Sequence, residues 1–175
     1  DLAKGEEKEI CLSLGCADKN SLPKDAPKDA NLRIRTPMRE LDIMVNHWLP
    51  YQTKTSRILA KSAYYQSGGA VGFRDQLQDS LMFLYNDPEF VRRQLLYFAE
   101  RQFAEGDVLH WWHFESTGVR THISDDLLFL PYAALQYIKT TEDLSILEEN
   151  CRYLQSEAIE NGKDLYRNFA FSEKR

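Results

Sequence analysis

The chain has 175 residues, enough for one globular domain with a hydrophobic core or for a piece of a larger protein. Its formal net charge is -5 and its basic residues are scattered, which argues against a nucleic-acid partner, because phosphate backbones are bound by clustered Lys and Arg. No stretch approaches the ~20 consecutive apolar residues of a membrane-spanning helix, so no membrane partner is predicted.

The cysteines and the first residues bear on the compartment. Cys11, Cys16 and Cys151 form an odd set without metal-ligand spacing, and we interpret them as reduced thiols. The opening DLAKGEEKEI has neither the basic region nor the apolar region of a secretory leader. These features predict a cytoplasmic protein.

The N-terminal part of the chain predicts one strand and a linker. Within residues 1–16, Ile10, Leu12 and Leu14 alternate with polar or small residues before Gly15, a period typical of a half-buried strand. A lone strand is not stable, so it is expected to pair with protein beyond this segment. Residues 17–35 hold two prolines and alternating charges, which indicate a linker.

From residue 36 to 175 the apolar period changes to that of helices. Thr36-Pro37 is typical of a helix start, and Pro50 is expected to kink or break the helix that follows. Four further helices are predicted, over 75–85, from Asp87-Pro88 to 99, from Ser124 to 138 and from Thr141 to 153. We therefore expect residues 37–155 to be almost wholly helical. Helices alone would also fit a bundle, a solenoid or an interaction scaffold.

Three segments between these helices are rich in polar and aromatic residues, namely 62–79, 102–113 and 118–126. A single Asp at a helix start is often only a cap, but this gathering of Asp, Arg, His and Trp favours a functional site. No phosphate-binding glycine loop, serine elbow or dinucleotide fingerprint is present. His110 and His113 lack a third ligand at motif spacing, so no metal site is predicted.

Carboxylate, Arg, His and Trp side chains are typical of carbohydrate-active sites. Cleavage of a glycosidic bond needs a carboxylic acid that protonates the leaving oxygen while a nucleophile attacks the anomeric carbon. A neighbouring carboxylate or burial favours the protonated form of such an acid. Asp125 and Asp126 are neighbours, although adjacent residues at a helix start need not face the same way. The residues themselves thus support a sugar-site hypothesis.

Four long motifs resemble glycoside hydrolase family 94: NHWLPYQTKTSR, YYQSGGAVGFRDQLQDSL, RQFAEGDVLHWWH and GVRTHISDDLLFLPYA. The resemblance covers roughly residues 32–160, with a weaker match of GEEKEICLSLG to the end of the family's N-terminal β-sandwich. The family contains cellobiose, cellodextrin, chitobiose and 1,2-β-oligoglucan phosphorylases and the phosphorylase-like part of cyclic β-1,2-glucan synthases. The QSGGAVGFRDQLQD wording is closer to the β-1,2-glucan branch.

The resemblance implies a mainly α fold. Residues 36–175 would form the first part of an (α/α)6 barrel, preceded by a remnant strand of a β-sandwich, with the three polar segments at the barrel mouth. The implied reaction is inverting phosphorolysis of a β-glucoside to α-glucose 1-phosphate, or its reverse. The implied partners are a β-linked glucose oligosaccharide and inorganic phosphate as co-substrate, without another cofactor, and a homodimer of the full-length enzyme is allowed.

The resemblance also assigns residues. Asp125 would be the catalytic acid. We interpret Asp126, which the resemblance does not assign, as a support of the helix start. The remaining substrate-binding candidates are Arg74, Asp75, Trp111, Trp112, His113 and Arg120. Lys61 stands where the family usually has a phosphate-contacting Arg, and it keeps the charge without the bidentate fork. Asp75, Trp112 and Asp125 are expected to converge on one concave face.

Two departures qualify this assignment. Ile123 stands where cellobiose-type members carry an aromatic residue, which argues against cellobiose as substrate. The later barrel helices, which bring the family's phosphate-gripping His and Thr, are not in these 175 residues, so the segment alone is expected to be inactive. The alternative is a fragment that serves only as a carbohydrate-binding or assembly module.

Overall fold

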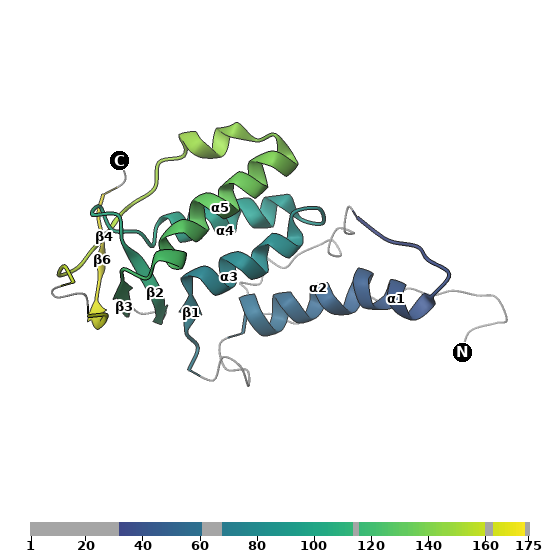
Figure 1. The fold of residues 1–175 in the computed structure, drawn as a ribbon, viewed down its shortest axis with the longest axis horizontal. Coiled ribbons are helices and arrows are strands. Elements are labelled where there is room, and N and C mark those ends of the chain that lie inside the picture. Colours follow the sequence, from purple (N-terminus) through teal and green to yellow (C-terminus); the bar gives the residue numbers. More distant parts are fainter. Residues whose placement is uncertain (1–31, 61–67, 114–115, 160–162, 174–175) are drawn as a thin grey trace, which may run out of the picture.

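The computed structural model describes residues 32–60, 68–113, 116–159 and 163–173. Its helices pack together, with a small antiparallel sheet at one end (Figure 1). The predicted strand near residues 8–14, most of the predicted linker and Lys61 lie outside the described residues. No helix among the described residues is long and apolar enough to cross a membrane.

The first helix, which was predicted to kink or break at Pro50, runs through this residue without a break. It comprises α1 (Arg39–Ile43), the π-type segment η1 (Met44–Trp48), α2 (Leu49–Gln52) and the π-type segment η2 (Thr53–Ile58). The junction residues keep right-handed helical dihedrals. A proline lacks the backbone N–H and crowds the carbonyl four residues back, and the wider π register on both sides of Pro50 accommodates such a residue.

The next helices follow the sequence prediction. They are α3 (Phe73–Ser80) with the 3-10 turn η4 (Leu81–Phe83), α4 (Pro88–Ala99) and α5 (Ser124–Thr141). The carboxylate of Asp87 accepts a hydrogen bond from the backbone N–H of Phe90 at 3.0 Å, which caps α4 as predicted. The last predicted helix is shorter than expected, because only the 3-10 turn η5 (Leu144–Glu148) forms.

The expectation that residues 37–155 are almost wholly helical is wrong, because three strands of a four-stranded antiparallel sheet lie in this region. The strands β1 (Val71–Gly72), β2 (Val108–His113), β3 (Thr117–Thr121) and β5 (Leu165–Asn168) are hydrogen-bonded in the order β1-β2-β3-β5. A second sheet pairs β4 (Leu154–Gln155) with β6 (Ala170–Phe171). Two of the three polar segments thus form the β2–β3 hairpin, in which β-branched and aromatic residues favour strands.

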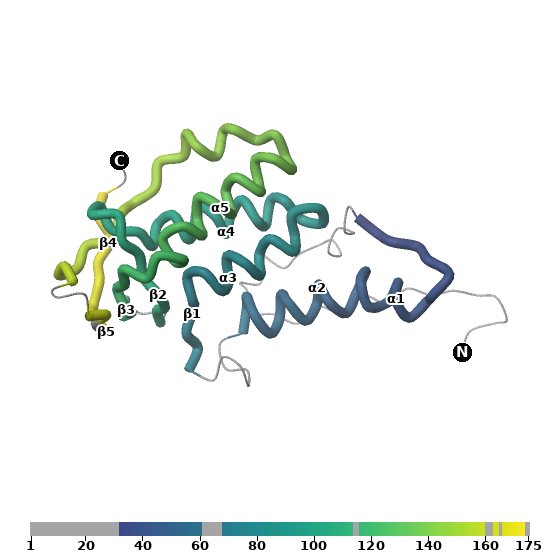
Figure 2. The backbone as a smooth tube through the Cα atoms, viewed as in Figure 1, coloured from purple at the N-terminus to yellow at the C-terminus, as the bar shows by residue number. Residues whose placement is uncertain are grey.

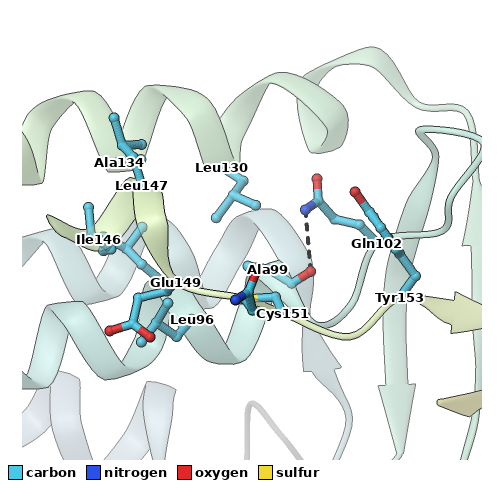
Figure 3. A pocket seen from close by; sticks show the side chains of 12 residues that line it. Leu96, Ala99, Gln102, Leu130, Ala134, Ile146, Leu147, Glu149, Cys151 and Tyr153 are labelled. Atoms are coloured by element: carbon cyan, nitrogen blue, oxygen red, sulfur yellow. Dashed lines mark hydrogen bonds between the residues drawn. The ribbon is translucent and has the colours of Figure 1, made fainter. Parts of the chain in front are cut away.

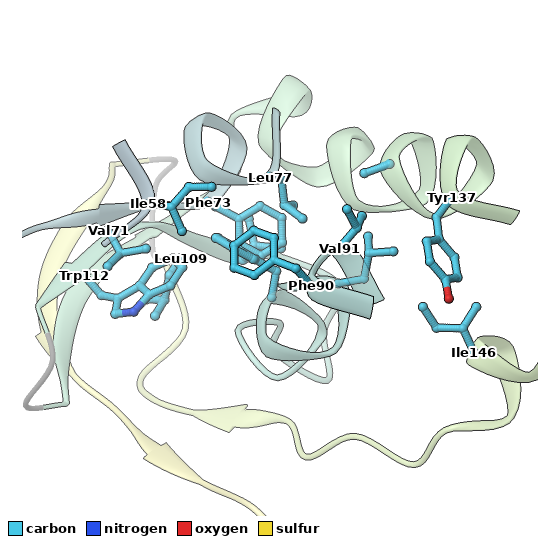
Figure 4. Close-up of a cluster of buried hydrophobic side chains, with 14 of the residues drawn as sticks. Ile58, Val71, Phe73, Leu77, Phe90, Val91, Leu109, Trp112, Tyr137 and Ile146 are labelled. Atoms are coloured by element: carbon cyan, nitrogen blue, oxygen red, sulfur yellow. The ribbon is translucent and has the colours of Figure 1, made fainter. Parts of the chain in front are cut away.

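The hydrophobic core joins the sheet to α3 and α4 (Figure 4). Trp112 is 1% exposed, and its ring lies 5.6 Å from that of Phe98, which in turn lies 5.6 Å from that of Phe73. Gly118 of β3 lies opposite Trp112, where a Cβ would come within 2.7 Å of the Cβ of Trp112. The sequence therefore needs glycine at this position for the hairpin to pack under the indole.

Large apolar side chains remain exposed along two helices. On α1 to α2 they include Leu41, Met44, Trp48 and Tyr51, and on α5 they are Leu128, Tyr132 and Leu135. Their helical spacing gives each helix an apolar stripe, and Figure 2 shows the first helix along one side of the molecule and α5 near the top. Stripes of this kind are typical of surfaces that pack against further protein.

Candidate functional site

Alternation along β2 places the two predicted tryptophans on opposite faces of the sheet. Trp112 pairs with Val71 and is buried in the core, while Trp111 pairs with Gly72 and is half-buried. His113, two residues after Trp111, shares its face. We call this face, opposite to Trp112, the outer sheet face.

Three rings gather on the outer sheet face. The ring of Trp111 lies 5.5 Å from that of Tyr166 and 5.5 Å from that of His113. His113 Nδ1 is 3.2 Å from the Tyr166 hydroxyl, which donates a hydrogen bond to the hydroxyl of Thr117 at 2.7 Å. Tyr166 is 53% exposed, so this aromatic cluster is open to solvent. Sequence reasoning missed Tyr166, although LYRN (165–168) in a polar tail is a short strand signal.

Arg74, Asp75 and Asp125 form an ionic cluster. Arg74 and Asp75 begin α3 directly after β1, and Asp125 stands in the first turn of α5. The guanidinium of Arg74 lies 3.6 Å from the carboxylate of Asp75 and 3.5 Å from that of Asp125. A Cβ built on Gly72, the register partner of Trp111, would lie 3.1 Å from Asp75 Oδ2, so this carboxylate is on the outer sheet face.

The ionic cluster is exposed to solvent. The side chains of Arg74, Asp75 and Asp125 are 43%, 58% and 61% exposed, so all three remain free to exchange partners with a ligand. Both carboxylates also stand at helix N-termini, where the helix dipole favours negative charge.

Asp126 differs sharply from its neighbour. It is 2% exposed, and its Oδ2 lies 2.7 Å from His110 Nδ1. Burial raises the pKa of Asp126, and the hydrogen bond and charge of His110 oppose that rise. The side chain thus ties α5 to β2, a contact beyond the helix-start support predicted for it. Sequence reasoning did not give His110 this role.

Arg120 lies in the interior, away from the ionic cluster. Its guanidinium forms a fork with the carboxylate of Asp107 and also donates to Glu105 Oε2 at 3.1 Å. Its remaining N–H groups donate to the backbone carbonyls of Ser156 and Glu157 at 3.1 and 3.2 Å. All five donors of the guanidinium are therefore used within the chain. Arg120 is thus placed to hold the segment at Ser156 and Glu157 rather than to bind a ligand.

The predicted site residues thus divide into two groups. Those on or beside the outer sheet face are Arg74, Asp75, Trp111, His113 and Asp125. Trp112 and Arg120 are buried, so the indole of Trp112 does not join Asp75 and Asp125, whose carboxylates both contact Arg74. Within the described ranges no three His, Cys, Asp or Glu side chains are placed to hold a metal ion.

A cavity of about 380 Å³ lies elsewhere, between α4, α5 and the segment after η5 (Figure 3). Leu96, Leu130, Ile146 and Cys151 are among its lining residues, and none of the predicted site residues lines it. The exposed carboxylates, guanidinium and rings are therefore separate from this mostly apolar cavity. They combine hydrogen-bond donors and acceptors with flat apolar faces, as binding of a polyhydroxylated ring requires.

Sequence comparisons identify relatives of this chain. The cyclic beta-(1,2)-glucan synthase NdvB of Rhizobium meliloti (strain 1021) is 48% identical over 133 residues, which cover 75% of this chain and 5% of that protein. The N,N'-diacetylchitobiose phosphorylases of Vibrio furnissii and Vibrio proteolyticus are 27% and 24% identical over 153 residues. These matches cover 71% of this chain and 19% of each phosphorylase, so the chain spans a small part of its relatives.

The family comparison covers most of the chain. Residues 28–169 match the family described as the glycosyl hydrolase 94 superfamily, catalytic domain. This range contains both the ionic cluster and the aromatic cluster. The chain belongs to the glycosyl hydrolase 94 superfamily.

Proposed function

We propose that this chain is part of an inverting β-glucoside phosphorylase, or of an enzyme that runs the reverse reaction, in which Asp125 is the general acid. The observation that carries the proposal is the position of Asp125, an exposed carboxyl beside the guanidinium of Arg74, which also contacts Asp75. The family membership and the names of the relatives support the reaction class.

In the proposed reaction, an oxygen of inorganic phosphate attacks the anomeric carbon from the face opposite the glycosidic bond. The glycosidic carbon–oxygen bond breaks, and Asp125 gives its proton to the departing oxygen. The products are α-glucose 1-phosphate and an oligosaccharide shortened by one sugar. Because phosphate is itself the nucleophile, one carboxylic acid suffices where water-using inverting enzymes need an acid and a base.

The neighbours of Asp125 would hold the sugar. The guanidinium of Arg74 offers N–H donors to sugar hydroxyls, and the carboxylate of Asp75 accepts hydrogen bonds from them. The guanidinium of Arg74 now contacts the carboxylates of Asp75 and Asp125 at 3.6 and 3.5 Å, and a bound sugar hydroxyl can replace such long, exposed contacts. The rings of Trp111 and Tyr166 offer the apolar surface on which the C–H face of a pyranose stacks.

The second candidate function is a non-catalytic module that binds carbohydrate or packs against further protein. The exposed apolar stripes on the first helix and on α5 favour it, because they are the kind of surface that other protein covers.

The two candidates are separated by product analysis of the complete protein that carries residues 1–175. The protein is incubated with inorganic phosphate and a β-1,2-glucan, a cellobiose-type or a chitobiose-type oligosaccharide, and the anomeric configuration of the product is read by NMR. We expect α-glucose 1-phosphate from the β-1,2-glucan, and no product without phosphate. Release of free glucose or of the β-phosphate contradicts the proposal, and binding without turnover supports the module.

A further inference from the structure

His110 interrupts the regular pairing of the hairpin. Leu109 pairs with Arg120 and Trp111 pairs with Val119, so His110 is the extra residue of a β-bulge between them. A bulge breaks the alternation of a strand and redirects a side chain, and such bulges are over-represented next to active sites. Here the redirected imidazole reaches the first turn of α5, where Nδ1 lies 2.7 Å from Asp126 Oδ2.

The burial of Asp126 makes its contact with His110 important for the position of α5. A carboxylate that is 2% exposed needs a hydrogen-bonding partner, because an unpaired buried charge is strongly destabilising. The bond therefore fixes the first turn of α5 to β2. Asp125 precedes Asp126 directly, so any shift of that turn moves the carboxyl of Asp125 as well.

We infer that His110 and Asp126 form a positioning pair that aims the carboxyl of Asp125 at the glycosidic oxygen, an inference that rests on the proposed function. Neither residue touches the reacting atoms in this scheme. The groups that face Asp126 are His110 from β2, Asp125 from its own helix and Asp75 from α3. Arg74 also contacts Asp125, so the acid lies between the first turn of α5 and an exposed guanidinium.

A purely structural bond would have different consequences. Its loss would lower the melting temperature and leave the rate of each folded molecule the same for every substrate. Loss of a positioning contact instead lowers the rate where a proton must be delivered, because a misplacement of about 1 Å can cost about 10²-fold. The rate on a substrate whose leaving group departs without a proton does not depend on the position of the Asp125 carboxyl.

The test compares two donors in the complete protein that carries residues 1–175, with inorganic phosphate as acceptor. One donor is a β-1,2-glucan oligosaccharide, and the other is 2,4-dinitrophenyl β-glucoside, whose phenolate leaves unprotonated. Asp126→Asn removes the charge, and His110→Phe keeps a ring without the Nδ1 donor. His110→Asn is the conservative variant, because its amide can still donate to Asp126. Asp79→Asn is the control, since it breaks another 2.7 Å contact, to Arg57, away from Asp125.

We expect kcat on the oligosaccharide to fall by about 10- to 100-fold in Asp126→Asn and His110→Phe, with KM nearly unchanged. The aryl glucoside should be cleaved at nearly the wild-type rate by both variants. His110→Asn should recover most of the loss, and Asp79→Asn should change both donors equally or not at all.

Wild-type rates in both pair variants, or equal losses on both donors, overturn the positioning role while leaving the proposed function intact. A wild-type protein that forms no glucose 1-phosphate from either donor overturns the proposed function, and the positioning role with it.

Discussion

Two arginines of this chain, each beside aspartates, have opposite surroundings. Arg74 is 43% exposed and shares its charge between Asp75 and Asp125, whereas Arg120 is 3% exposed and forms a fork with Asp107. Arg74 keeps N–H donors that a ligand can use, whereas all five donors of Arg120 are hydrogen-bonded within the chain. The same residue types therefore mark a candidate site in one place and a structural support in the other, and burial makes the difference.

The largest effect on stability is expected from the two tryptophans of β2, which repeat this contrast on one strand. Trp112→Ala should lower the free energy of unfolding by about 3–5 kcal/mol, because it leaves a cavity beside Phe98 and removes the hydrogen bond to Tyr97. Trp111→Ala should cost about 1 kcal/mol or less, since the side chain lies on the outer sheet face. It should weaken oligosaccharide binding instead. Urea unfolding and calorimetric titration measure the two effects, and a reversed order would contradict the assignment of faces.

The two arginine groups themselves give the next test. Asp107→Asn leaves the buried guanidinium of Arg120 with the exposed carboxylate of Glu105 as its remaining ion-pair partner, and we expect a loss of about 3 kcal/mol in unfolding free energy. Arg74→Ala removes only exposed ion pairs, which contribute about 0–1 kcal/mol. Arg74→Ala should nevertheless raise KM for the sugar, while Asp107→Asn should leave the activity of each folded molecule unchanged. Equal losses of stability in the two variants would contradict the distinction between the exposed ion pairs of Arg74 and the buried ion pair of Arg120.

A smaller, pH-dependent effect on stability is expected from Asp143, which belongs to neither the Arg74 nor the Arg120 ion pairs. Hydrogen bonds from Ser145 and then from Tyr137 lower the pKa of Asp143 from 3.8 to about 2. Because the native pKa is depressed, this contribution to stability is present above pH 3.8 and is lost as pH falls toward about 2. Asp143→Asn should therefore flatten the pH dependence of the unfolding free energy between these values. An unchanged slope in the variant would show that other carboxyls produce it.

The helices were more predictable from the sequence than the sheet. The start of α4 could be predicted because Asp87 and Pro88 carry a local signal, a capping carboxylate and a fixed φ, which needs no distant contact. The strand β2 could not, because its bulge at His110 breaks the period of two that identifies strands. Pro50 also carries a local signal, which favours the end of a helix, but the π register of the flanking turns accommodates the proline and the helix continues.

The candidate site was predictable in residue type and less so in geometry. The motifs gave Arg74, Asp75 and Asp125, which the fold brings together through Arg74. Strand alternation decides whether Trp111 or Trp112 lies on the outer sheet face. The sequence does not identify residues 108–113 as a strand, so this alternation could not be predicted. Tyr166 comes from a distant part of the sequence, and only the pairing of β3 with both β2 and β5 brings it beside Trp111. His110 precedes Trp111 directly, but only the bulge in β2 turns it toward Asp126.

The central claim is that Asp125 acts as the acid, and the rate of glucose 1-phosphate release by Asp125→Asn tests it most directly. General acid catalysis contributes about 10²–10⁴-fold, so the rate on a β-1,2-glucan oligosaccharide should fall by that factor in the complete protein. The melting temperature should stay near that of the wild type, because the side chain is 61% exposed. A variant that keeps the wild-type rate would contradict the assignment, and so would a dead Asp126→Asn beside a fully active Asp125→Asn.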